Sequence, residues 1–574
     1  MTLFLIWLAM LGALWVAEHG AARFPFAVAA LVYLAAAALL VVGDPLRATL
    51  LAAIMAVVIA GFSAVKHHHS GTRLTVADLW LTFSGSIPFI LRQYRRTSAI
   101  TIAAAAALAL AVIATLSLAA GPPVRLDLRV GLLAVATALY LLLYRASGGA
   151  GAFRPTVTER AHVFSGFMAS LIDVSSWWRS AGLRLGDIAR DPLPLSARIP
   201  GRASHQPDIL VVQHESLFDP RIFGLPVEPE IERFLSPPAG RSGRLHVEIY
   251  GGGSWQTEFS MLTGLSSRSF GPDSYFLFRK GAGRFHHSLP RSLSGLGYRA
   301  MLAAACRRQF MGYDAFYDSI GVDERLFSED FPPPFDLARF EDTSSDAMFL
   351  QAAGRAFAER LARDSMPVFL LALTNFNHGP HDRRRVPPGS FETARAFAHA
   401  SLPDAHYAEY YARLAETVAS WTALRTSLAA RFPDRPMLVV HYGDHQPVMT
   451  RRIEAALGIA EDDRRQFTTF FAIEGINLQP ASIGDLPDAG LDVAFLGTVA
   501  LRAAGLPLDP IFATRASLLA DCGEDYFAST SERKRRFHRS LVDMGLIETG
   551  PPQDGVLAPE LAQQKVRRSP PPAG

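Results

Sequence analysis

Cysteine is almost absent from this chain, whose 574 residues include only Cys306 and Cys522. Two cysteines allow one disulfide at most, which excludes a disulfide framework, and they form no CxxC pair or Cys/His cluster for a structural zinc ion. An excess of charge of one sign is also absent, because 56 Lys and Arg residues against 53 Asp and Glu residues leave a net charge of +3. We therefore expect no nucleic-acid partner.

Long apolar runs, by contrast, are concentrated before residue 145. Five of them cover residues 3–17, 26–42, 48–65, 98–119 and 130–144. Their lengths approach the roughly 20 residues that a helix needs to cross the hydrocarbon core of a membrane. We predict a transmembrane domain over residues 1–147 with about five helices. A further apolar stretch, 79–91, is short and contains Pro88, so we expect it to be interfacial or re-entrant.

The charges between these runs leave the orientation in the membrane open. The loop 66–96 carries five basic residues, which are Lys66, Arg73, Arg92, Arg95 and Arg96. The positive-inside rule would place this loop in the cytoplasm, and five spans would then place everything after residue 147 there too. The opposite topology breaks the rule at this loop, so counting charges does not decide the side.

Residues 148–204 are predicted to form an amphipathic linker helix and a connector. The stretch 157–185 combines basic residues with large apolar side chains, namely Phe164, Phe167, Met168, Leu171, Ile172, Trp177 and Trp178. Such a helix can lie on the bilayer surface or pack on the soluble domain, and the sequence favours neither.

From residue 205, short β-like runs alternate with helical stretches. The runs are 208–213, 245–250, 299–304, 367–373, 437–442 and 468–473, and the helical stretches include 257–264, 286–296, 345–364 and 404–431. This alternation predicts an α/β domain with a mostly parallel sheet over residues 205–547. The tail 548–574 is rich in Pro, Gly and Gln, and we predict that it is disordered.

Polar side chains follow several of these runs. Glu215 and the pair Asp444 and His445 each come just after a β-like run, and Thr257 comes after three glycines. In a parallel sheet the carboxyl ends of the strands meet at one edge, so these side chains can converge there. Two carboxylates, an imidazole and a hydroxyl make an oxygen-rich set of four ligands for one divalent ion. Manganese or magnesium suits this set, and zinc is possible.

Thr257 has two interpretations. A hydroxyl bound to a divalent ion has a lowered pKa and can attack phosphorus, and a covalent phospho-threonine would divide the transfer into two steps. At the start of a run of helix-forming residues, the same hydroxyl can instead be an ordinary helix cap. Ser254 competes with Thr257 in both roles. The presence of Glu215, Asp444 and His445 as further ligands favours the nucleophile over the helix cap as the role of Thr257.

A further polar turn follows the run 367–373 and reads Thr374-Asn-Phe-Asn-His-Gly-Pro-His381. Either histidine, His378 or His381, can donate a hydrogen bond to a phosphate or protonate a leaving group. We favour His378, because it lies nearer the end of the strand, and expect one of the two to be only a turn residue.

These motifs together resemble those of the alkaline phosphatase–sulfatase superfamily, most closely its lipoteichoic acid synthase and phosphoglycerol transferase branch. The resemblance covers about residues 205–510 and extends to the apolar runs before residue 145. It is carried by His214-Glu-Ser-Leu-Phe-Asp-Pro220, Trp255-Gln-Thr-Glu-Phe259 with Leu262-Thr-Gly264, Tyr317-Asp-Ser-Ile-Gly-Val-Asp323, Asn377-His-Gly-Pro380 and Gly443-Asp-His-Gln-Pro447. It implies a multi-span α-helical membrane domain followed by a sulfatase-like α/β domain with a mostly parallel central sheet.

The resemblance also implies a site and a reaction. Glu215, Thr257, Asp444 and His445 would hold one divalent metal, typically manganese, with Thr257 as the nucleophile and His378 binding the phosphate or headgroup. The donor would be phosphatidylglycerol, which leaves diacylglycerol, and the acceptor a surface or periplasmic glycan or a lipid-linked group. The catalytic domain would face the periplasm or exterior from the cell (inner) membrane, against the charge count of the loop 66–96.

One feature of that branch is missing, the aromatic-Asn-Arg stretch shortly after a Phe. Phe310 is followed here by Met-Gly-Tyr, so Arg307 or Arg308 would have to supply the charge near the substrate.

Two alternative functions stay open. One is a phosphoethanolamine transferase of the same superfamily, although such enzymes typically use zinc and carry several disulfides. The other is a sulfatase-like phosphodiesterase or hydrolase, although the segment 255–259 lacks the C/S-x-P-x-R motif of sulfatases.

Overall fold

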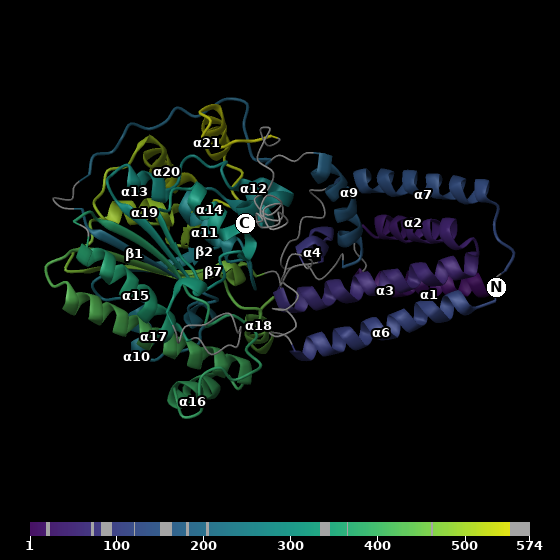
Figure 1. Ribbon diagram of the computed structural model, residues 1–574, viewed down its shortest axis with the longest axis horizontal. Helices are drawn as coiled ribbons and strands as arrows, with labels where there is room; N and C mark the ends of the chain where they lie inside the picture. Colours follow the sequence, from purple (N-terminus) through teal and green to yellow (C-terminus); the bar gives the residue numbers. More distant parts are fainter. Residues whose placement is uncertain are drawn as a thin grey trace, which may run out of the picture.

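Two parts of the chain lie next to each other in the computed structural model, a group of long N-terminal helices and an α/β domain (Figure 1). The structure describes residues 1–18, 23–70, 74–81, 95–119, 121–149, 163–179, 183–201, 206–332, 345–363, 365–460 and 463–550. Most of the stretch 79–91, which we predict to be interfacial or re-entrant, lies outside these residues, and so does the tail after residue 550.

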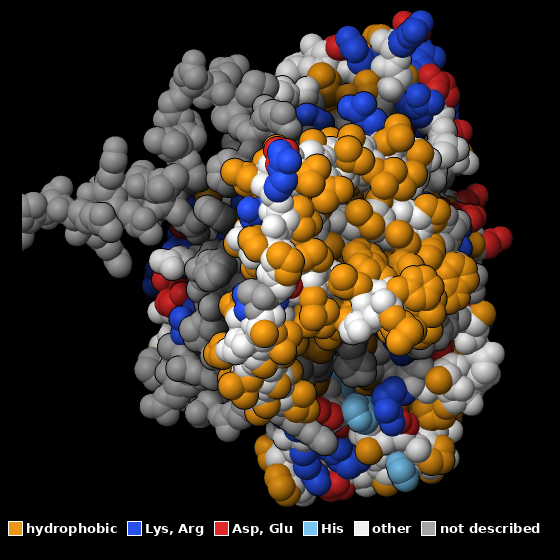
Figure 2. All heavy atoms as spheres, turned by 90° about the vertical axis from the view of Figure 1, so that its right-hand side faces the viewer, with side chains coloured by type: hydrophobic (Ala, Val, Ile, Leu, Met, Phe, Trp, Pro, Cys, Tyr) orange, Lys and Arg blue, Asp and Glu red, His pale blue; other side chains and the backbone are white. Residues whose placement is uncertain are grey.

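Each of the five predicted apolar runs is a helix. These helices are α1 (Thr2–Ala17), α2 (Phe24–Val42), α3 (Pro45–Ser70), α6 (Arg95–Ser117) and α7 (Leu126–Ala146). By length and composition α2, α3, α6 and α7 can each cross a membrane, whereas α1, with 16 residues, is a shorter apolar helix. Hydrophobic side chains gather over this part of the surface (Figure 2), as a bundle surrounded by lipid requires.

The two ends of this helical group differ in what they contact. The N-terminus lies at the end away from the α/β domain, whereas the end of α3 that carries Lys66 reaches that domain (Figure 1). Lys66 Nζ lies 5.7 Å from the centroid of the Tyr275 ring. The start of the basic loop 66–96 and the α/β domain therefore lie on the same side of the helices, which is the arrangement that five passes produce.

The linker contains helix α9 (Ser165–Arg179), which is attached to the membrane helices. Side chains at and before its start are buried in one cluster with α2 and α7, namely those of Phe164, Phe167 and Met168. Glu18, just after α1, accepts hydrogen bonds from the N–H groups of Phe164 and Ser165 at 2.9 and 3.0 Å and so caps α9. The side chains of Trp177 and Trp178 lie outside the described part of the chain.

The α/β domain is built around an eight-stranded sheet with the order β4-β3-β5-β1-β6-β7-β2-β8. The strands are β1 (Asp208–His214), β2 (Arg241–His246), β3 (Arg299–Ala304), β4 (Glu324–Leu326), β5 (Val368–Leu373), β6 (Met437–Gly443), β7 (Thr468–Ile476) and β8 (Leu491–Asp492). Neighbours from β4 to β6 are parallel, and β7 is antiparallel to both β6 and β2. The predicted fold class, a helical membrane domain followed by an α/β domain with a mostly parallel sheet, is confirmed.

Helices cover both faces of this sheet. One face carries α11 (Trp255–Thr263), α12 (Leu277–Gly281), α13 (Leu289–Ser294), α14 (Tyr313–Ser319), α19 (Leu496–Ala503), α20 (Pro510–Cys522) and α21 (Glu532–Asp543). The other carries α10 (Pro229–Leu235), α15 (Asp346–Arg363), α16 (Glu392–Ser401), α17 (Ala405–Arg431) and α18 (Thr450–Leu457). Alternate strand residues feed the two cores, so that Val211 joins the first and Val212 the second. A sheet covered in this way is reached by solvent and ligands at the ends of its strands.

One of the predicted β-like runs is wrong in its bounds. The run 245–250 overlaps β2 by two residues only, because β2 begins four residues earlier and pairs antiparallel with β7. The chain then leaves the sheet and passes through Gly251, Gly252 and Gly253, with φ angles of 76°, 152° and 95°. Glycine adopts such backbone angles without a Cβ clash, so this run lets the chain turn directly into α11.

Gly443, the last residue of β6, has no room for a side chain. A Cβ atom there would lie 1.9 Å from the main-chain oxygen of Leu217. We expect Gly443→Ala to lower the free energy of unfolding by about 2 kcal/mol or more, because two neighbouring main-chain segments must move apart. Thermal unfolding of the purified proteins measures this loss. Gly186→Ala is the matched control, since its Cβ would meet the Ser269 oxygen at 3.5 Å, and equal destabilisation by both variants would contradict the expectation.

Candidate metal centre

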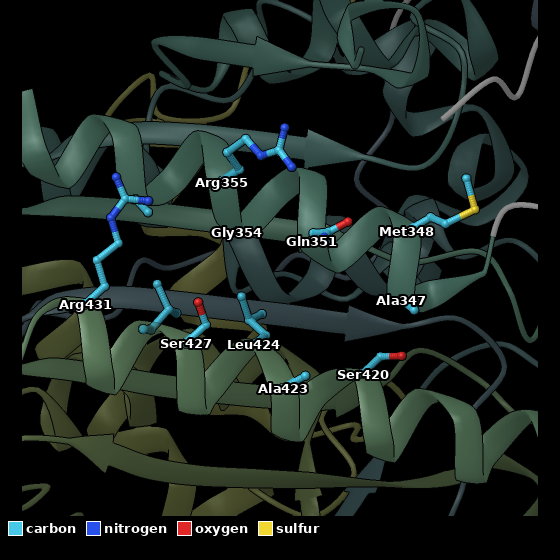
Figure 3. Close-up of a pocket in the computed structure, with 12 residues that line it drawn as sticks. Ala347, Met348, Gln351, Gly354, Arg355, Ser420, Ala423, Leu424, Ser427 and Arg431 are labelled. Carbon is cyan, nitrogen blue, oxygen red and sulfur yellow. The ribbon is translucent and has the colours of Figure 1, made fainter. Parts of the chain in front are cut away.

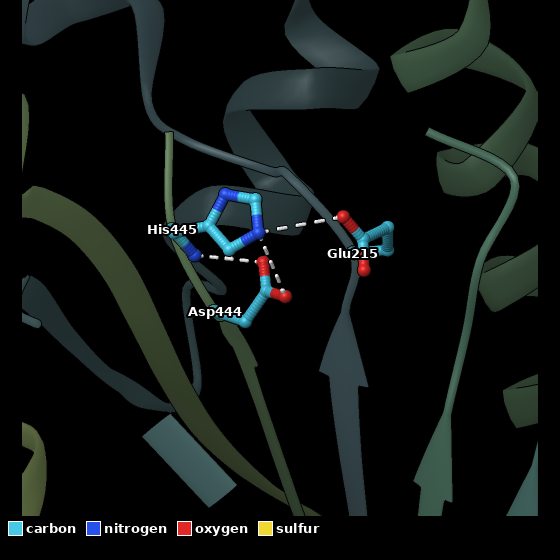
Figure 4. Close-up of side chains that lie close together, drawn as sticks. All are labelled: Glu215, Asp444 and His445. Carbon is cyan, nitrogen blue, oxygen red and sulfur yellow. Dashed lines mark hydrogen bonds and ion pairs between the residues drawn. The ribbon is translucent and has the colours of Figure 1, made fainter. Parts of the chain in front are cut away.

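Three ligand-type side chains converge at the carboxyl edge of the sheet, those of Glu215, Asp444 and His445 (Figure 4). Their ligand atoms lie within 4.8 Å of one another. His445 Nε2 is 3.5 Å from both Glu215 Oε1 and Asp444 Oδ2. Strands β1 and β6 are parallel neighbours in which His214 pairs with Gly443, so the residues that follow the two strands emerge side by side.

The main chain after Glu215 holds the two carboxylates in place. Ser216 has a φ angle of 55°, a left-handed conformation that costs a non-glycine residue on the order of 1–3 kcal/mol. From it, the Ser216 N–H donates a 2.7 Å hydrogen bond to Asp444 Oδ1, and the hydroxyl donates one of 2.7 Å to Glu215 Oε1. Ser216 thus links both acids, a role that the sequence pattern does not reveal.

The two acids are buried, and their charges repel each other. Burial raises the pKa of Asp444 well above its usual value, and the neighbouring Glu215 raises it further. Burial acts in the same direction at Glu215, but His445 and His378 hold the pKa of that carboxyl below its usual value. Asp444 Oδ2 is buried without a hydrogen-bond donor among the described residues. A positive charge beside this oxygen would relieve the repulsion.

The donor set fits a divalent cation. Burial lowers the pKa of His445, although the charge of Glu215 acts in the opposite direction, and burial thus favours the neutral imidazole that a metal ligand requires. Its Nδ1 lies 3.0 Å from the main-chain oxygen of Gln446, and a hydrogen bond there leaves Nε2 free to act as a ligand beside Glu215 and Asp444. Two carboxylate oxygens and one imidazole nitrogen suit manganese, magnesium or zinc.

Two hydroxyls reach these ligands, that of Ser216, which is buried, and that of Ser254, which is partly exposed. Ser254 Oγ donates a hydrogen bond to Glu215 Oε2 at 3.1 Å and lies 3.5 Å from His445 Nε2. Ser254 precedes α11, but its side chain makes no capping hydrogen bond, so the helix does not use this hydroxyl. The residue is partly exposed and stands at a helix N-terminus, where main-chain N–H groups stabilise an anion such as phosphate.

Thr257 does not occupy that place, which corrects the prediction that it is the nucleophile and a metal ligand. Thr257 is the third residue of α11 and has no exposed surface. Its hydroxyl donates a 2.9 Å hydrogen bond to the main-chain oxygen of Asp444. A hydroxyl that is enclosed and bound to a carbonyl is out of reach of a substrate. Thr257 supports the Asp444 main chain instead.

The two histidines of the turn 374–381 differ in their surroundings. His378 is half-buried, and burial lowers its pKa. The negative charge of Glu215 acts in the opposite direction, so the two side chains interact electrostatically. His381 is 3% exposed, and its ring packs edge-on against Tyr410. His378 is thus the more exposed of the two histidines, and substrate binding by either one stays a prediction.

Arg308 is already neutralised by neighbouring acids. Its guanidinium lies 3.0 Å from Asp314 and 2.6 Å from Asp330, and it stacks over the Phe327 ring at 4.7 Å. These contacts do not support the prediction that Arg308 supplies charge to the substrate. Arg307 is half-buried, and its role stays a prediction.

A buried carboxyl that sequence reasoning missed joins the elements of the site. Glu258 in α11 accepts hydrogen bonds from Tyr313 at 2.8 Å, Tyr317 at 2.5 Å and Gln213 at 3.1 Å. Gln213 in turn accepts a 2.7 Å hydrogen bond from Tyr442. This network connects β1, β6, α11 and α14 directly beneath the ligands. The two tyrosines, four residues apart on one helix face, were the signal in the sequence.

A groove of about 560 Å³ lies elsewhere, between α15 and α17 (Figure 3). Arg355 and Arg431 stand toward one end, and Met348 and Ser420 toward the other. None of the three ligands lines it. The groove is therefore separate from the metal centre.

Residues 207–477 match the family model described as Sulfatase. The matched part contains Glu215, Asp444, His445 and Ser254. The match confirms the resemblance to the alkaline phosphatase–sulfatase superfamily that the motifs indicate.

Three individual proteins show the range of the similarity. The capsular polysaccharide biosynthesis protein RkpI of Rhizobium meliloti is 28% identical over 247 residues, 42% of either chain. The phosphoglycerol transferase GacH of Streptococcus pyogenes, solved with sn-glycerol-1-phosphate, is 16% identical with a TM-score of 0.44, over 59% of this chain and 85% of that one. The lipooligosaccharide phosphoethanolamine transferase EptA of Neisseria meningitidis is 12% identical with a TM-score of 0.48, over 90% and 98%. The chain spans about half the length of the curated relatives it matches.

The buried position of Glu258 predicts a dependence of stability on pH. Burial raises its pKa from 4.5 to about 7, against the effect of its hydrogen bonds. Because the folded state holds this proton more tightly than the unfolded state, stability is greatest below pH 4.5 and is lost as the pH rises through 7, by up to about 3 kcal/mol. Unfolding of wild type and Glu258→Gln, measured from pH 4.5 to 7.5, isolates this contribution as the difference between the two. Parallel curves would show that Glu258 titrates normally.

The converging ligands predict one bound ion per chain. We expect Asp444→Asn to weaken Mn²⁺ binding at least about 100-fold, since it removes a charged ligand. Elemental analysis and calorimetric titration of the purified full-length protein measure the number and affinity of ions. Asp492→Asn, which alters a buried carboxyl outside the cluster, is the control and should bind Mn²⁺ like wild type. Two ions per wild-type chain, or equal loss in both variants, would rule out this assignment.

Proposed function

We propose that this chain is a membrane-anchored, metal-dependent phosphotransferase that moves phosphoglycerol from phosphatidylglycerol to a glycan or lipid-linked acceptor. The observation that carries the proposal is the position of Ser254 Oγ, 3.1 Å from Glu215 Oε2 and 3.5 Å from His445 Nε2. A partly exposed hydroxyl beside a divalent-cation ligand set, in a sulfatase-family domain, is suited to attack phosphorus.

The site residues divide the work between them. Glu215, Asp444, His445 and Ser254 would hold the ion, manganese by preference and magnesium or zinc as alternatives. Such an ion lowers the pKa of a bound hydroxyl and neutralises charge on a phosphoryl group. His378 binds a phosphoryl oxygen or the headgroup, and the N-terminus of α11 adds main-chain N–H groups on the same side.

The transfer proceeds in two steps through a phospho-serine. Ser254 Oγ attacks the phosphorus of the donor, a bond from Oγ to phosphorus forms, and the bond to the diacylglycerol oxygen breaks as that oxygen leaves with a proton. A hydroxyl of the acceptor then attacks the same phosphorus and releases Ser254. Dividing one displacement into two lets the donor leave before the acceptor arrives.

The membrane helices support a lipid donor and a site at the membrane surface. The α/β domain then faces the periplasm or exterior from the cell (inner) membrane, where surface and periplasmic glycans are reached. The similarity to a capsular polysaccharide biosynthesis protein supports a glycan as the acceptor.

A phosphoethanolamine transferase is the second candidate, because the aromatic-Asn-Arg stretch is absent after Phe310 and Arg308 is paired with Asp314 and Asp330. Against it, Cys306 and Cys522 are both free, whereas such enzymes tend to carry several disulfides. A sulfatase-like phosphodiesterase, in which water takes the place of the acceptor, is a further outcome of the same assay.

We expect Ser254→Ala to lower diacylglycerol release from phosphatidylglycerol at least about 1000-fold, since no nucleophile replaces the hydroxyl. Thr257→Val, the matched control, should stay within about tenfold of wild type and lose about 1 kcal/mol of stability with its hydrogen bond. The assay uses the full-length protein in vesicles and quantifies diacylglycerol by mass spectrometry.

The same vesicles distinguish the candidates. Release from phosphatidylethanolamine alone would replace the first candidate by the second, and free glycerol phosphate without an acceptor adduct would indicate a hydrolase. An active Ser254→Ala protein with an inactive Thr257→Val protein would overturn the assignment of the nucleophile.

A further inference from the structure

The membrane helices touch the catalytic domain close to Ser254. Lys66, near the end of α3, holds its Nζ 5.7 Å from the centroid of the Tyr275 ring. The same ammonium pairs with Asp78 Oδ1 at 2.8 Å, in the short helix α4 (Val76–Leu81) that follows α3. A cation this close to an aromatic face is attracted to it, so Lys66 links the membrane part to Tyr275.

Tyr275 in turn packs against Trp255, the residue that follows Ser254. Their ring centroids are 4.9 Å apart at 79°, an edge-to-face contact. Trp255 Nε1 also donates a 2.8 Å hydrogen bond to the main-chain oxygen of Tyr275. Trp255 is 6% exposed and is the first residue of α11, so its position and that of Ser254 are fixed together. A single ring therefore separates a membrane helix from the neighbour of the nucleophile.

We propose that the contact Lys66–Tyr275–Trp255 is a positioning device that sets Ser254 at the level of a lipid headgroup, so that turnover of a donor embedded in a bilayer depends on it. This inference rests on the proposed function. A diacyl lipid moves freely within the membrane plane, but raising it out of the bilayer exposes its acyl chains to water, which is unfavourable. The site must therefore meet the headgroup where it lies.

A water-soluble donor has no such constraint, because it diffuses to the site from any direction. Loss of the Lys66–Tyr275–Trp255 contact should therefore slow turnover of the bilayer donor and leave turnover of the water-soluble donor unchanged. A role in the internal geometry of the site alone would affect both donors equally.

Two substitutions break the contact from opposite sides. Lys66→Met removes the charge and leaves the catalytic domain unchanged, and Asp78 keeps its hydrogen bonds from the N–H and hydroxyl of Thr75. Tyr275→Ala removes the ring but keeps the Trp255 hydrogen bond, because its acceptor is a main-chain oxygen. Arg125→Met is the control, since Arg125 also pairs with a nearby acid, Asp127, but at the exposed start of α7.

The test compares two donors on full-length protein in phosphatidylcholine vesicles. One donor is long-chain phosphatidylglycerol within the bilayer, and the other is dihexanoyl phosphatidylglycerol added in solution. We expect Lys66→Met and Tyr275→Ala to slow turnover of the bilayer donor about tenfold or more, and that of the soluble donor less than about twofold, while Arg125→Met changes neither.

Equal loss with both donors, or no loss with either, would overturn the positioning role. Failure of the proposed function is separate and visible, because wild type would then release diacylglycerol from neither donor. If the wild-type protein uses only phosphatidylethanolamine, the comparison is made with the long-chain and dihexanoyl forms of that lipid. Equal loss with both forms, or no loss with either, would again overturn the positioning role.

Discussion

The structure depends on one electrostatic constraint, the burial of two carboxylates within 4.8 Å of each other and of one imidazole. The parallel pairing of β1 with β6 imposes it, because Glu215 and Asp444 follow strands that end in register. Burial, and after it the charge of Glu215, raise the pKa of Asp444. A bound cation would offset this cost, so an unfavourable feature of the folded chain is also what suits it to hold a metal ion.

Much of the surrounding structure serves to hold these groups still. Ser216 accepts a left-handed backbone conformation in order to donate to Asp444, and Gly443 lets the main chain of Leu217 approach without a side chain between. Below the ligands, Glu258 joins two tyrosines and Gln213 into one buried network. Tight support of this kind is what a site needs to keep a nucleophile and a metal at a fixed separation.

The sequence was sufficient for the membrane helices, for most of the central strands and for the three converging side chains, but not for β4, β8 or the hydroxyl. Apolar runs of the right length predict the membrane helices and the central strands, and polar residues just after two parallel strands must meet, which locates Glu215, Asp444 and His445. The presence of Glu215, Asp444 and His445 indicates a nucleophilic hydroxyl nearby, but it does not distinguish Thr257 from Ser254. Three glycines with positive φ angles bring Ser254, not Thr257, to the helix start.

Other features depend on partners that are distant in the sequence. Arg308 pairs with Asp314 in α14 and with Asp330 after β4, and Glu258 is buried against two tyrosines of α14 and Gln213 of β1. The contact of Lys66 with Tyr275 joins residues more than 200 positions apart. No local pattern predicts such pairs, since they follow from the packing of whole elements.

The most direct test of the account is the location of the covalent phosphoryl group. The full-length protein is incubated with the lipid donor in the absence of acceptor, and the tryptic peptide 245–268 is fragmented in a mass spectrometer. Breaks on either side of Gln256 separate Ser254 from Thr257. The account predicts the glycerophosphate adduct on Ser254, and an adduct on Thr257 would contradict it.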